Sequence, residues 1–299
     1  MTPLRVGFLL PRYHQPSRSH LPAAMRILAE WGVTVEVIHP RDGAVDLSTV
    51  RVEHDLYVFK KISGPAASIA GVLHALGAAM VNPYPATMAL RDKVIASHLL
   101  QAAGVPTPAT YVASHLTQLA PLLEGGPLIV KPVGGTEGFG VRVVRTPDEL
   151  AAVPAGKDPL FAQRYHPPQG RDRKIYSIGG RLFGVKKIFP ARTEAEKHGE
   201  PFIPTPELCE ITLRCSRALG IDLFGIDIVE SEGRPYVVDM SSMPGFKGVP
   251  DAPSYLASYL YDAAKRAVRA QPLREPAETR ARDPGRAWAV STMPTAGER

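Results

Sequence analysis

The sequence has few cysteines, no long apolar run and no cluster of basic residues. Its two cysteines, Cys209 and Cys215, lie six positions apart rather than at the C-x-x-C spacing of a metal pair, so we expect reduced thiols. The longest apolar runs, such as residues 6–10, are far shorter than the ~20 residues of a membrane span. The start of the chain shows no signal-peptide pattern, so we expect a cytoplasmic protein with no membrane partner.

The charge is positive but not concentrated. The formal net charge is +6, yet the basic residues are scattered, with no run of five or six and no interleaved aromatics. This pattern gives no support for a nucleic-acid partner. A site for polyphosphate ligands explains a modest positive surplus equally well.

In the first part of the chain, segments with the apolar spacing of a helix alternate with segments that have the pattern of a strand. Predicted helices cover residues 20–31 and 65–76, and the buried or alternating runs typical of strands cover residues 5–10, 33–38, 55–59 and 79–81. Strands that alternate with helices indicate a parallel sheet with helices on both faces. We therefore expect an α/β fold that begins with a parallel α/β domain over residues 1–85.

The rest of the chain starts with one long predicted helix over residues 86–103 and then changes to short strands joined by turns. The strands expected are residues 109–112, 128–130, 141–144, 160–163, 174–178, 181–185, 223–229 and 235–240, and further helices cover residues 206–219 and 255–270. We expect subdomains at residues 86–162 and 163–270. Residues 271–299 are rich in Pro, Arg, Glu and Ala without apolar periodicity, so we expect a solvated, disordered tail.

A glycine-rich turn joins two of these predicted strands, in the stretch P-L-I-V-K-P-V-G-G-T-E-G-F-G-V-R-V-V of residues 127–144. Glycines let backbone N–H groups approach an anion closely, and Lys131 precedes them on the incoming strand. Such a hairpin would cover phosphates from above, with the lysine directed at the same phosphates. A purely structural turn remains an equal alternative for this motif alone.

Two carboxylates fall on neighbouring predicted strands. Asp227 lies between Ile226 and Ile228, and Asp239 lies between Val238 and Met240, so strand alternation would turn both carboxylates to one side. Two carboxylates among apolar residues repel each other unless a cation joins them. Oxygen ligands of this kind favour Mg²⁺ with nucleotide phosphates, although aspartates that only cap turns are the alternative.

Taken together, the order of these motifs resembles the ATP-grasp enzymes, and most closely the RimK-type ligases, over residues 6–248. The stretches that carry the resemblance are N-P-Y-P-A of residues 82–86 with R-D-K of 91–93, K131 with G-T-E-G-F-G-V of 135–141, G-R-D-R-K of 170–174, G-I-D of 225–227, and D-M-S-S-M-P-G of 239–245. The resemblance implies an ATP-grasp fold preceded by its usual N-terminal α/β domain.

The resemblance also implies roles for single residues. Lys93 and Lys131 would hold the α- and β-phosphates of ATP. The flap residues would be Gly135, Thr136, Gly138 and Gly140, and the adenine hinge Gln163, Arg164, Tyr165 and His166. Asp172 would bind the ribose, and Mg²⁺ (or Mn²⁺) would be bound by Asp227, Asp239 and Ser241. Lys174, together with Lys186 or Lys187, would face the γ-phosphate and the reacting carboxylate as catalytic residues.

The activity implied is ATP-dependent joining of a carboxylate to an amine through an acyl phosphate. The substrates would be small molecules or peptides, and a homo-oligomer is left open. Three positions depart from the ligase pattern: Asp239 and Ser241 replace the usual Glu and Asn, and Lys174 replaces an arginine. Residues 239–246 also resemble the ATP-grasp inositol-phosphate kinases. A small-molecule kinase and an ATP-binding protein with weakened catalysis therefore stay as alternatives.

Overall fold

The computed structural model describes residues 3–11, 19–40, 43–60, 63–132, 140–154, 159–188, 193–270 and 290–292. The chain forms two compact units. Unit 1 contains residues 1–84, 243–246 and 250–299, and unit 2 contains residues 85–242 and 247–249. No helix among the described residues is both long and apolar enough to cross a membrane.

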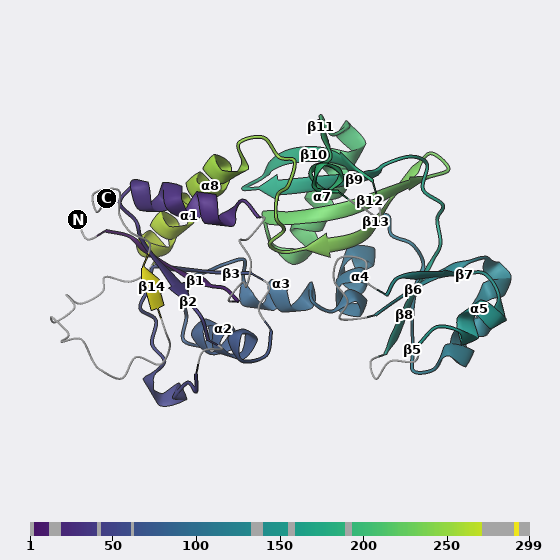
Figure 1. Cartoon of the computed structure of the whole chain (residues 1–299), viewed down its shortest axis with the longest axis horizontal. Helices are drawn as coiled ribbons and strands as arrows, with labels where there is room; N and C mark the ends of the chain where they lie inside the picture. The colour runs from purple at the N-terminus through teal and green to yellow at the C-terminus, as the bar shows by residue number, and fades with distance from the viewer. Residues whose placement is uncertain are drawn as a thin grey trace. The chain divides into compact units, whose positions relative to one another are not determined.

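Unit 1 is built on a five-stranded sheet in the order β14-β2-β1-β3-β4, whose four N-terminal strands are parallel. Helices α1 and α8 lie side by side on one face, and α2 lies on the other (Figure 1). Its elements are β1 (Arg5–Leu9), α1 (Leu21–Glu30), β2 (Thr34–Ile38), η1 (Leu47–Thr49), β3 (Leu56–Phe59), α2 (Pro65–Ala75), β4 (Met80–Val81), α8 (Ala252–Ala270) and β14 (Val290–Thr292). The expected parallel sheet with helices on both faces is confirmed.

Two expectations about the C-terminal part were different from what the structure shows. Helix α8 packs on α1 and β3, so it belongs with unit 1 and not with the strands that precede it. Its buried residues, among them Leu256 and Leu260, give the apolar face that this packing requires. The expectation of a disordered tail is wrong for Val290–Thr292, because these residues form β14, which pairs antiparallel with β2. Residues 271–289 and 293–299 lie outside the described residues.

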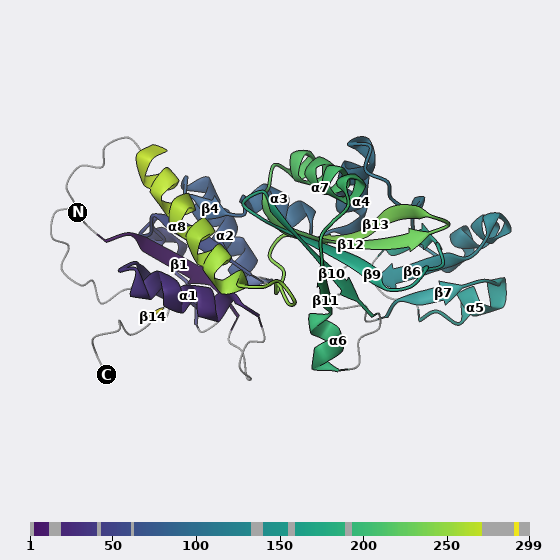
Figure 2. The same ribbon diagram turned by 90° about the horizontal axis from the view of Figure 1, so that it is seen from above.

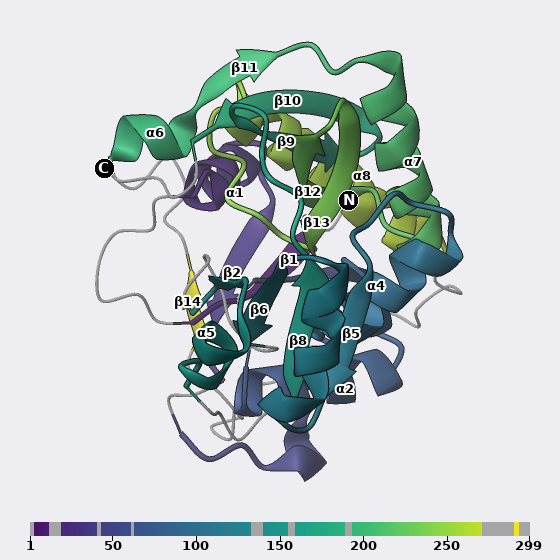
Figure 3. The same ribbon diagram turned by 90° about the vertical axis from the view of Figure 1, so that its right-hand side faces the viewer.

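Unit 2 contains two antiparallel sheets, in the orders β5-β8-β6-β7 and β11-β10-β9-β12-β13. Figure 3 shows β5, β8 and β6 side by side. The elements are α3 (Tyr84–Ala89), α4 (Lys93–Ala102), β5 (Thr110–Ala113), η2 (Leu116–Gly125), β6 (Leu128–Pro132), β7 (Arg142–Val144), α5 (Pro147–Ala151), β8 (Leu160–Arg164), β9 (Asp172–Ile178), β10 (Arg181–Lys187), α6 (Glu194–His198), β11 (Glu200–Phe202), α7 (Pro206–Leu219), β12 (Leu223–Ser231) and β13 (Arg234–Ser241).

The single long helix expected over residues 86–103 is wrong, because the chain forms two helices, α3 and α4. The break has a local cause: Asp92 has an extended backbone, and its carboxylate accepts hydrogen bonds from the N–H groups of Val94 (2.8 Å) and Ile95 (3.2 Å). Aspartate is a strong helix N-cap, so a new helix begins directly after it. Lys93 is therefore the first residue of α4.

Helix α7 follows its sequence signals closely. Thr205 caps its start by accepting from the N–H of Leu208, and Gly220 ends it in a left-handed conformation (φ 62°). Its apolar side packs on the larger sheet together with α4 (Figure 2). The helix therefore closes one face of that sheet and leaves the other face for polar side chains.

Candidate active site

A row of three charged residues crosses the larger sheet of unit 2. Asp227 on β12 is paired with Lys174 on β9 and with Asp239 on β13. Residues directly opposite each other on neighbouring strands have side chains on the same face. Lys174 Nζ donates to both carboxylate oxygens of Asp227, at 2.7 and 2.9 Å. The structure thus brings together two of the three expected metal ligands and one expected catalytic lysine.

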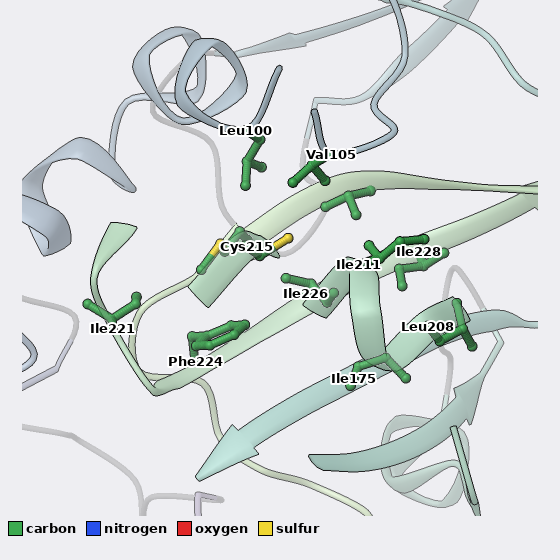
Figure 4. Close-up of a cluster of buried hydrophobic side chains, with 12 residues drawn as sticks. Leu100, Val105, Ile175, Leu208, Ile211, Cys215, Ile221, Phe224, Ile226 and Ile228 are labelled. Atoms are coloured by element: carbon green, nitrogen blue, oxygen red, sulfur yellow. The ribbon is translucent and has the colours of Figure 1, made fainter. Parts of the chain in front are cut away.

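The opposite face of the same strands is apolar. Ile175, Ile226 and Ile228, the neighbours of the charged residues along the chain, are fully buried against α7 and α4 (Figure 4). The polar and apolar alternation of β9 and β12 therefore assigns one face to the core and the other to the charged row.

A β-bulge changes this alternation on β13. Asp227 pairs with Asp239, but the next residue, Ile228, pairs with Val237, so Val238 is an extra residue. As a result Val237 and Met240 are the β13 residues in the core, and Val238 is not. The expectation that Val238 and Met240 share the apolar face was wrong for Val238, because no feature of the sequence distinguishes the bulge.

The bulge provides a contact for Lys131. Lys131 Nζ donates to the carbonyl of Val238 (3.3 Å) and to Oε1 of Gln163 on β8 (2.8 Å). Burial lowers the pKa of Lys131, and nearby Lys93 lowers it further, while Asp239 and Asp227 oppose the shift. A buried ammonium next to a second lysine is a favourable place for an anion.

The pKa of Asp239 is shifted in the opposite direction to that of Lys131. Asp239 is exposed as a residue, and its carboxyl is close enough to the other charged groups of the site to be affected by them. Burial and the charge of Asp227 raise the pKa of Asp239, whereas Lys93, Lys174 and Lys131 limit the rise. Two carboxylates that destabilise each other in this way are stabilised when a cation joins them.

Lys174 is held in its charged form. Burial alone would lower the pKa of Lys174, but the adjacent Asp227 carboxylate, with Tyr176 and Asp239, raises it above the ordinary lysine value. The side chain of Lys174 is 16% exposed and that of Asp227 is 36% exposed. The ion pair is therefore open to solvent on its Asp227 side.

Further polar groups lie on the same face of the sheet. Lys187 on β10 is paired with Asp172 on β9, and its Nζ donates to the hydroxyl of Tyr176 (3.0 Å). Burial and the charge of Lys174 lower the pKa of Lys187 to about 8. Burial and Asp227 raise the pKa of Asp172 to about 6. Both groups thus titrate near neutral pH, as groups at functional sites commonly do.

Lys186 does not join this group. It pairs with Arg173, and both side chains lie over the ring of Phe202, 5.7 and 5.8 Å from its centre. Alternation on β10 directs Lys186 away from the face that carries Lys187. Its position gives no support for the expected catalytic role, because the sequence could not decide which of two consecutive lysines faces the site.

The expected adenine hinge is mostly engaged in other contacts. Gln163 is buried, accepts from Lys131 and donates through Nε2 to the hydroxyl of Thr110 (3.2 Å). The guanidinium of Arg164 donates to the carbonyls of Leu122 (2.9 Å) and Gly126.

The backbone of the hinge is partly engaged as well. The N–H groups of Arg164 and Tyr165 donate to the carbonyls of Ala109 and Pro127. His166 stacks on Tyr236 with ring centres 3.9 Å apart. Adenine binding by these residues stays a prediction. Of the four, only His166 has its described contact with a residue of the other sheet of unit 2, Tyr236 on β13.

The remaining expected residues are less informative. Ser241 Oγ approaches the Gly225 carbonyl at 3.5 Å, on the same face as Asp239. Gly140 has φ of 77°, a conformation that favours glycine. The flap residues Gly135, Thr136 and Gly138 lie outside the described residues.

Sequence reasoning missed two residues that hold the site. Thr110 supports Gln163 and so supports Lys131, and no local signal marks it. Tyr176 contacts Lys187, and its ring centre is 5.7 Å from Lys174 Nζ. Its spacing of two from Lys174 on a predicted strand could have placed it on the same face.

The chain from α4 to α8 matches a known family over this same site. The RimK-like ATP-grasp domain matches residues 90–256, more than half of the chain. The chain belongs to the RimK-like ATP-grasp family. The ATP-grasp fold expected from the order of motifs is thereby confirmed, with its mixed parallel and antiparallel sheets.

Individual relatives agree with this family. The chain is 29% identical to a probable alpha-L-glutamate ligase 2 of Shewanella frigidimarina over 54% of this chain and 59% of that protein. It is 29% identical to a probable alpha-L-glutamate ligase of Citrobacter koseri over 58% of this chain and 63% of that protein. The chain thus matches less than two thirds of the length of these curated relatives.

Solved structures show the same fold. The RimK domain ATP-grasp protein of Sphaerobacter thermophilus has a TM-score of 0.69 at 19% identity and covers 87% of this chain and 98% of its own. The ATP-grasp ligase PsnB, complexed with a minimal precursor, Mg and ADP, has a TM-score of 0.68 at 16% identity and covers 88% and 99%. At these identities the likeness concerns the fold.

Proposed function

We propose that this RimK-like ATP-grasp protein is an ATP-dependent carboxylate–amine ligase. The observation that carries the proposal is the row Lys174–Asp227–Asp239 on one face of the sheet, with Lys131 bonded to the residue next to Asp239. Cations and carboxylates arranged in this way suit a metal-bound polyphosphate. Membership of the family supports the choice of ATP.

The residues present fit a magnesium–nucleotide complex. Among the residues that the structure describes, no group of three or more His, Cys, Asp or Glu is arranged to hold a metal ion. Asp227 and Asp239 would therefore supply only part of a coordination shell, and phosphate oxygens would supply more, as is usual for Mg²⁺. Mn²⁺ would fit the same oxygens, and Ser241 would add a hydroxyl from the same face. The bound metal would offset the negative charge of the phosphates.

The lysines would position the reacting groups. Lys131 and Lys93 would bind the α- and β-phosphates, with Gln163 fixing the direction of the Lys131 side chain. Lys174 and Lys187 would attract the γ-phosphate and the substrate carboxylate to the same face. Attack of that carboxylate on the γ-phosphorus would give an acyl phosphate and ADP, and an amine would then displace phosphate to give an amide. Such catalysis is largely positioning and electrostatic stabilisation.

The relatives suggest the class of substrates. Curated relatives are named as alpha-L-glutamate ligases, and PsnB is complexed with a peptide precursor. We propose that an amino acid is the amine and that a small molecule or a peptide supplies the carboxylate.

The test is the fate of the γ-phosphate. The protein is incubated with ATP, Mg²⁺ and pooled amino acids and peptides, with and without hydroxylamine, and ADP, phosphate and products are measured by mass spectrometry. A ligase gives ADP, free phosphate and an amide, and hydroxylamine diverts the acyl phosphate to a hydroxamate. A stable phosphoester without hydroxamate would instead identify a kinase. ATP binding without any ADP release would identify a protein with weakened catalysis.

A further inference from the structure

The carboxylate expected to bind metal already holds a cation of the chain. Lys174 Nζ lies 2.7 and 2.9 Å from the two oxygens of Asp227, so its ammonium occupies the position between those oxygens. A metal ion that bound Asp227 would need the same lone pairs and would bring two positive charges next to the ammonium. Lys174 and a metal ion therefore compete for Asp227.

We propose that Lys174 blocks metal binding at Asp227 until the phosphates of a nucleotide attract its ammonium, so that the metal is bound only together with the nucleotide. This inference rests on the proposed function, because it takes Asp227 as a metal ligand. It adds a role for Lys174 before the reaction starts, as a positioning residue that sets the order of binding.

The balance of charge around Asp239 supports this order. Two carboxylates, Asp227 and Asp239, face three ammonium groups that act on Asp239 from three different elements. These groups belong to Lys93 at the start of α4, Lys131 on β6 and Lys174 on β9. Without a polyphosphate this group of charges carries a positive excess, which repels a free divalent cation. With a polyphosphate the excess becomes negative, and phosphate oxygens offer the lysines further acceptors.

The surroundings allow Lys174 to move. Its ammonium has the Tyr176 ring 5.7 Å away, an aromatic surface that attracts a cation. Asp227 is 36% exposed, so solvent already reaches the carboxylate that the ammonium would leave. The block is thus an ion pair at a partly open surface and not a sealed core contact.

The experiment measures binding of Mn²⁺ to the full chain in the absence of nucleotide, by the electron paramagnetic resonance signal of the free ion. We expect Lys174→Gln to bind Mn²⁺ at least ~10-fold more tightly than the wild type. The matched control is Lys186→Gln, which removes one positive charge from the opposite face of the same sheet and should change the affinity by less than ~2-fold. The double variant Lys174→Gln, Asp227→Asn should lose the gain.

The inference is overturned if Lys174→Gln binds Mn²⁺ no more tightly than the wild type, or if Lys186→Gln gains as much. Circular dichroism checks that each variant is folded, and Lys174→Met provides a second neutral replacement if the first is not. The proposed function is tested separately by calorimetric titration of the wild type with ADP in excess Mg²⁺. Binding of ADP without a gain in Lys174→Gln refutes only the order of binding, whereas absence of ADP binding refutes the proposed function.

Discussion

Each unit of the protein contains a close contact between a basic and an acidic side chain, and the two contacts differ in their exposure. In unit 1, His54 Nε2 lies 2.7 Å from Glu36 Oε2, and the two side chains are only 1% and 7% exposed. Arg5 adds a second partner for Glu36 at 3.3 Å. In unit 2, Lys174 and Asp227 are as close, but they are 16% and 36% exposed.

The difference separates an enclosed pair in unit 1 from a solvent-accessible pair in the proposed site of unit 2. Gly7 makes room for the His54 ring, since a Cβ atom at Gly7 would lie 3.0 Å from it, and the pair is enclosed by the sheet. An enclosed pair cannot exchange its partner for a ligand, whereas an exposed pair can. We therefore expect changes in unit 1 to affect stability and changes in the charged row of unit 2 to affect activity.

The largest effect is expected for Asp227→Asn. Loss of this carboxylate should lower the rate of ADP release on the order of 100-fold or more, because Asp227 would hold the metal ion that offsets the charge of the phosphates. The midpoint of thermal unfolding should change little, because partly exposed ion pairs contribute about 1 kcal/mol or less. Coupled ADP assays and thermal melts of the same preparation measure both. A large fall in the melting temperature with unchanged activity would instead show that the Lys174–Asp227 pair contributes to stability and not to activity.

Glu36→Gln should have the opposite profile. It removes the carboxylate that faces buried His54 and partly exposed Arg5. Because burial lowers the pKa of His54, the main loss is a buried hydrogen bond, and we expect a loss of about 2 kcal/mol in the free energy of unfolding. Urea titration followed by tryptophan fluorescence reports on Trp31 of the same unit. Activity per folded molecule should stay within ~2-fold of the wild type, because the pair lies outside the proposed site. Equal stability of variant and wild type would show that the buried Glu36 contacts do not contribute to the free energy of unfolding.

Asp172→Asn tests whether an ionised carboxylate on the proposed active-site face lowers the free energy of unfolding. The pKa of Asp172 is raised to about 6 in the folded protein, from 3.8, so the folded state holds its proton over a pH range in which the unfolded state has lost it. This carboxyl therefore favours folding below pH 3.8, and the benefit is lost as pH rises through 6. At pH 7.5 the variant should be more stable by roughly 1–2 kcal/mol, and the difference should vanish near pH 4.

Thermal melts from pH 4 to 8 check this prediction, with Asp148→Asn on exposed α5 as the control. Asp148→Asn should not reproduce the rise with pH. A variant that is destabilised at pH 7.5 would show that the ionised carboxylate is stabilised by partners in the folded state.

The smallest effect is expected for Thr110→Val. It removes the hydroxyl that supports Gln163 while keeping the volume, and loss of one hydrogen bond of this kind should weaken nucleotide binding about 5-fold through Lys131. Thr110→Ser keeps the hydroxyl and should bind as the wild type does. Isothermal titration with ADP and Mg²⁺ measures both variants, and equal weakening in the two would assign the effect to packing.

Much of the fold was predictable because local signals were strong. Helix α7 had Thr205 at its start and Gly220 at its end, and the turn Gly179-Gly180 has positive φ at both glycines, as a two-residue hairpin requires. The break before Lys93 was missed because the apolar pattern continues through it. Only the bonds of the Asp92 carboxylate show that it caps a new helix.

Strand alternation correctly predicts the face that Asp227 occupies, whereas the prediction for Asp239 holds only with respect to Met240, because the bulge interrupts the alternation at Val238. Contacts between distant segments were not predictable. The bond from Lys131 to Val238 spans 107 positions and depends on an extra residue that leaves no mark on the local pattern. The choice between Lys186 and Lys187 depends on register, which a short polar strand end does not specify.

The extra residue on β13 has one more consequence. Lys131 spans two sheets, since one acceptor, Gln163, lies on β8 and the other, Val238, lies on β13. Deletion of Val238 would restore an uninterrupted pairing with β12, with Val237 and Asp239 still on opposite faces, and would remove the carbonyl that Lys131 contacts. The geometry of Lys131 is thus tied to the length of a strand that is distant in the sequence, and we expect a one-residue deletion there to change the proposed nucleotide site.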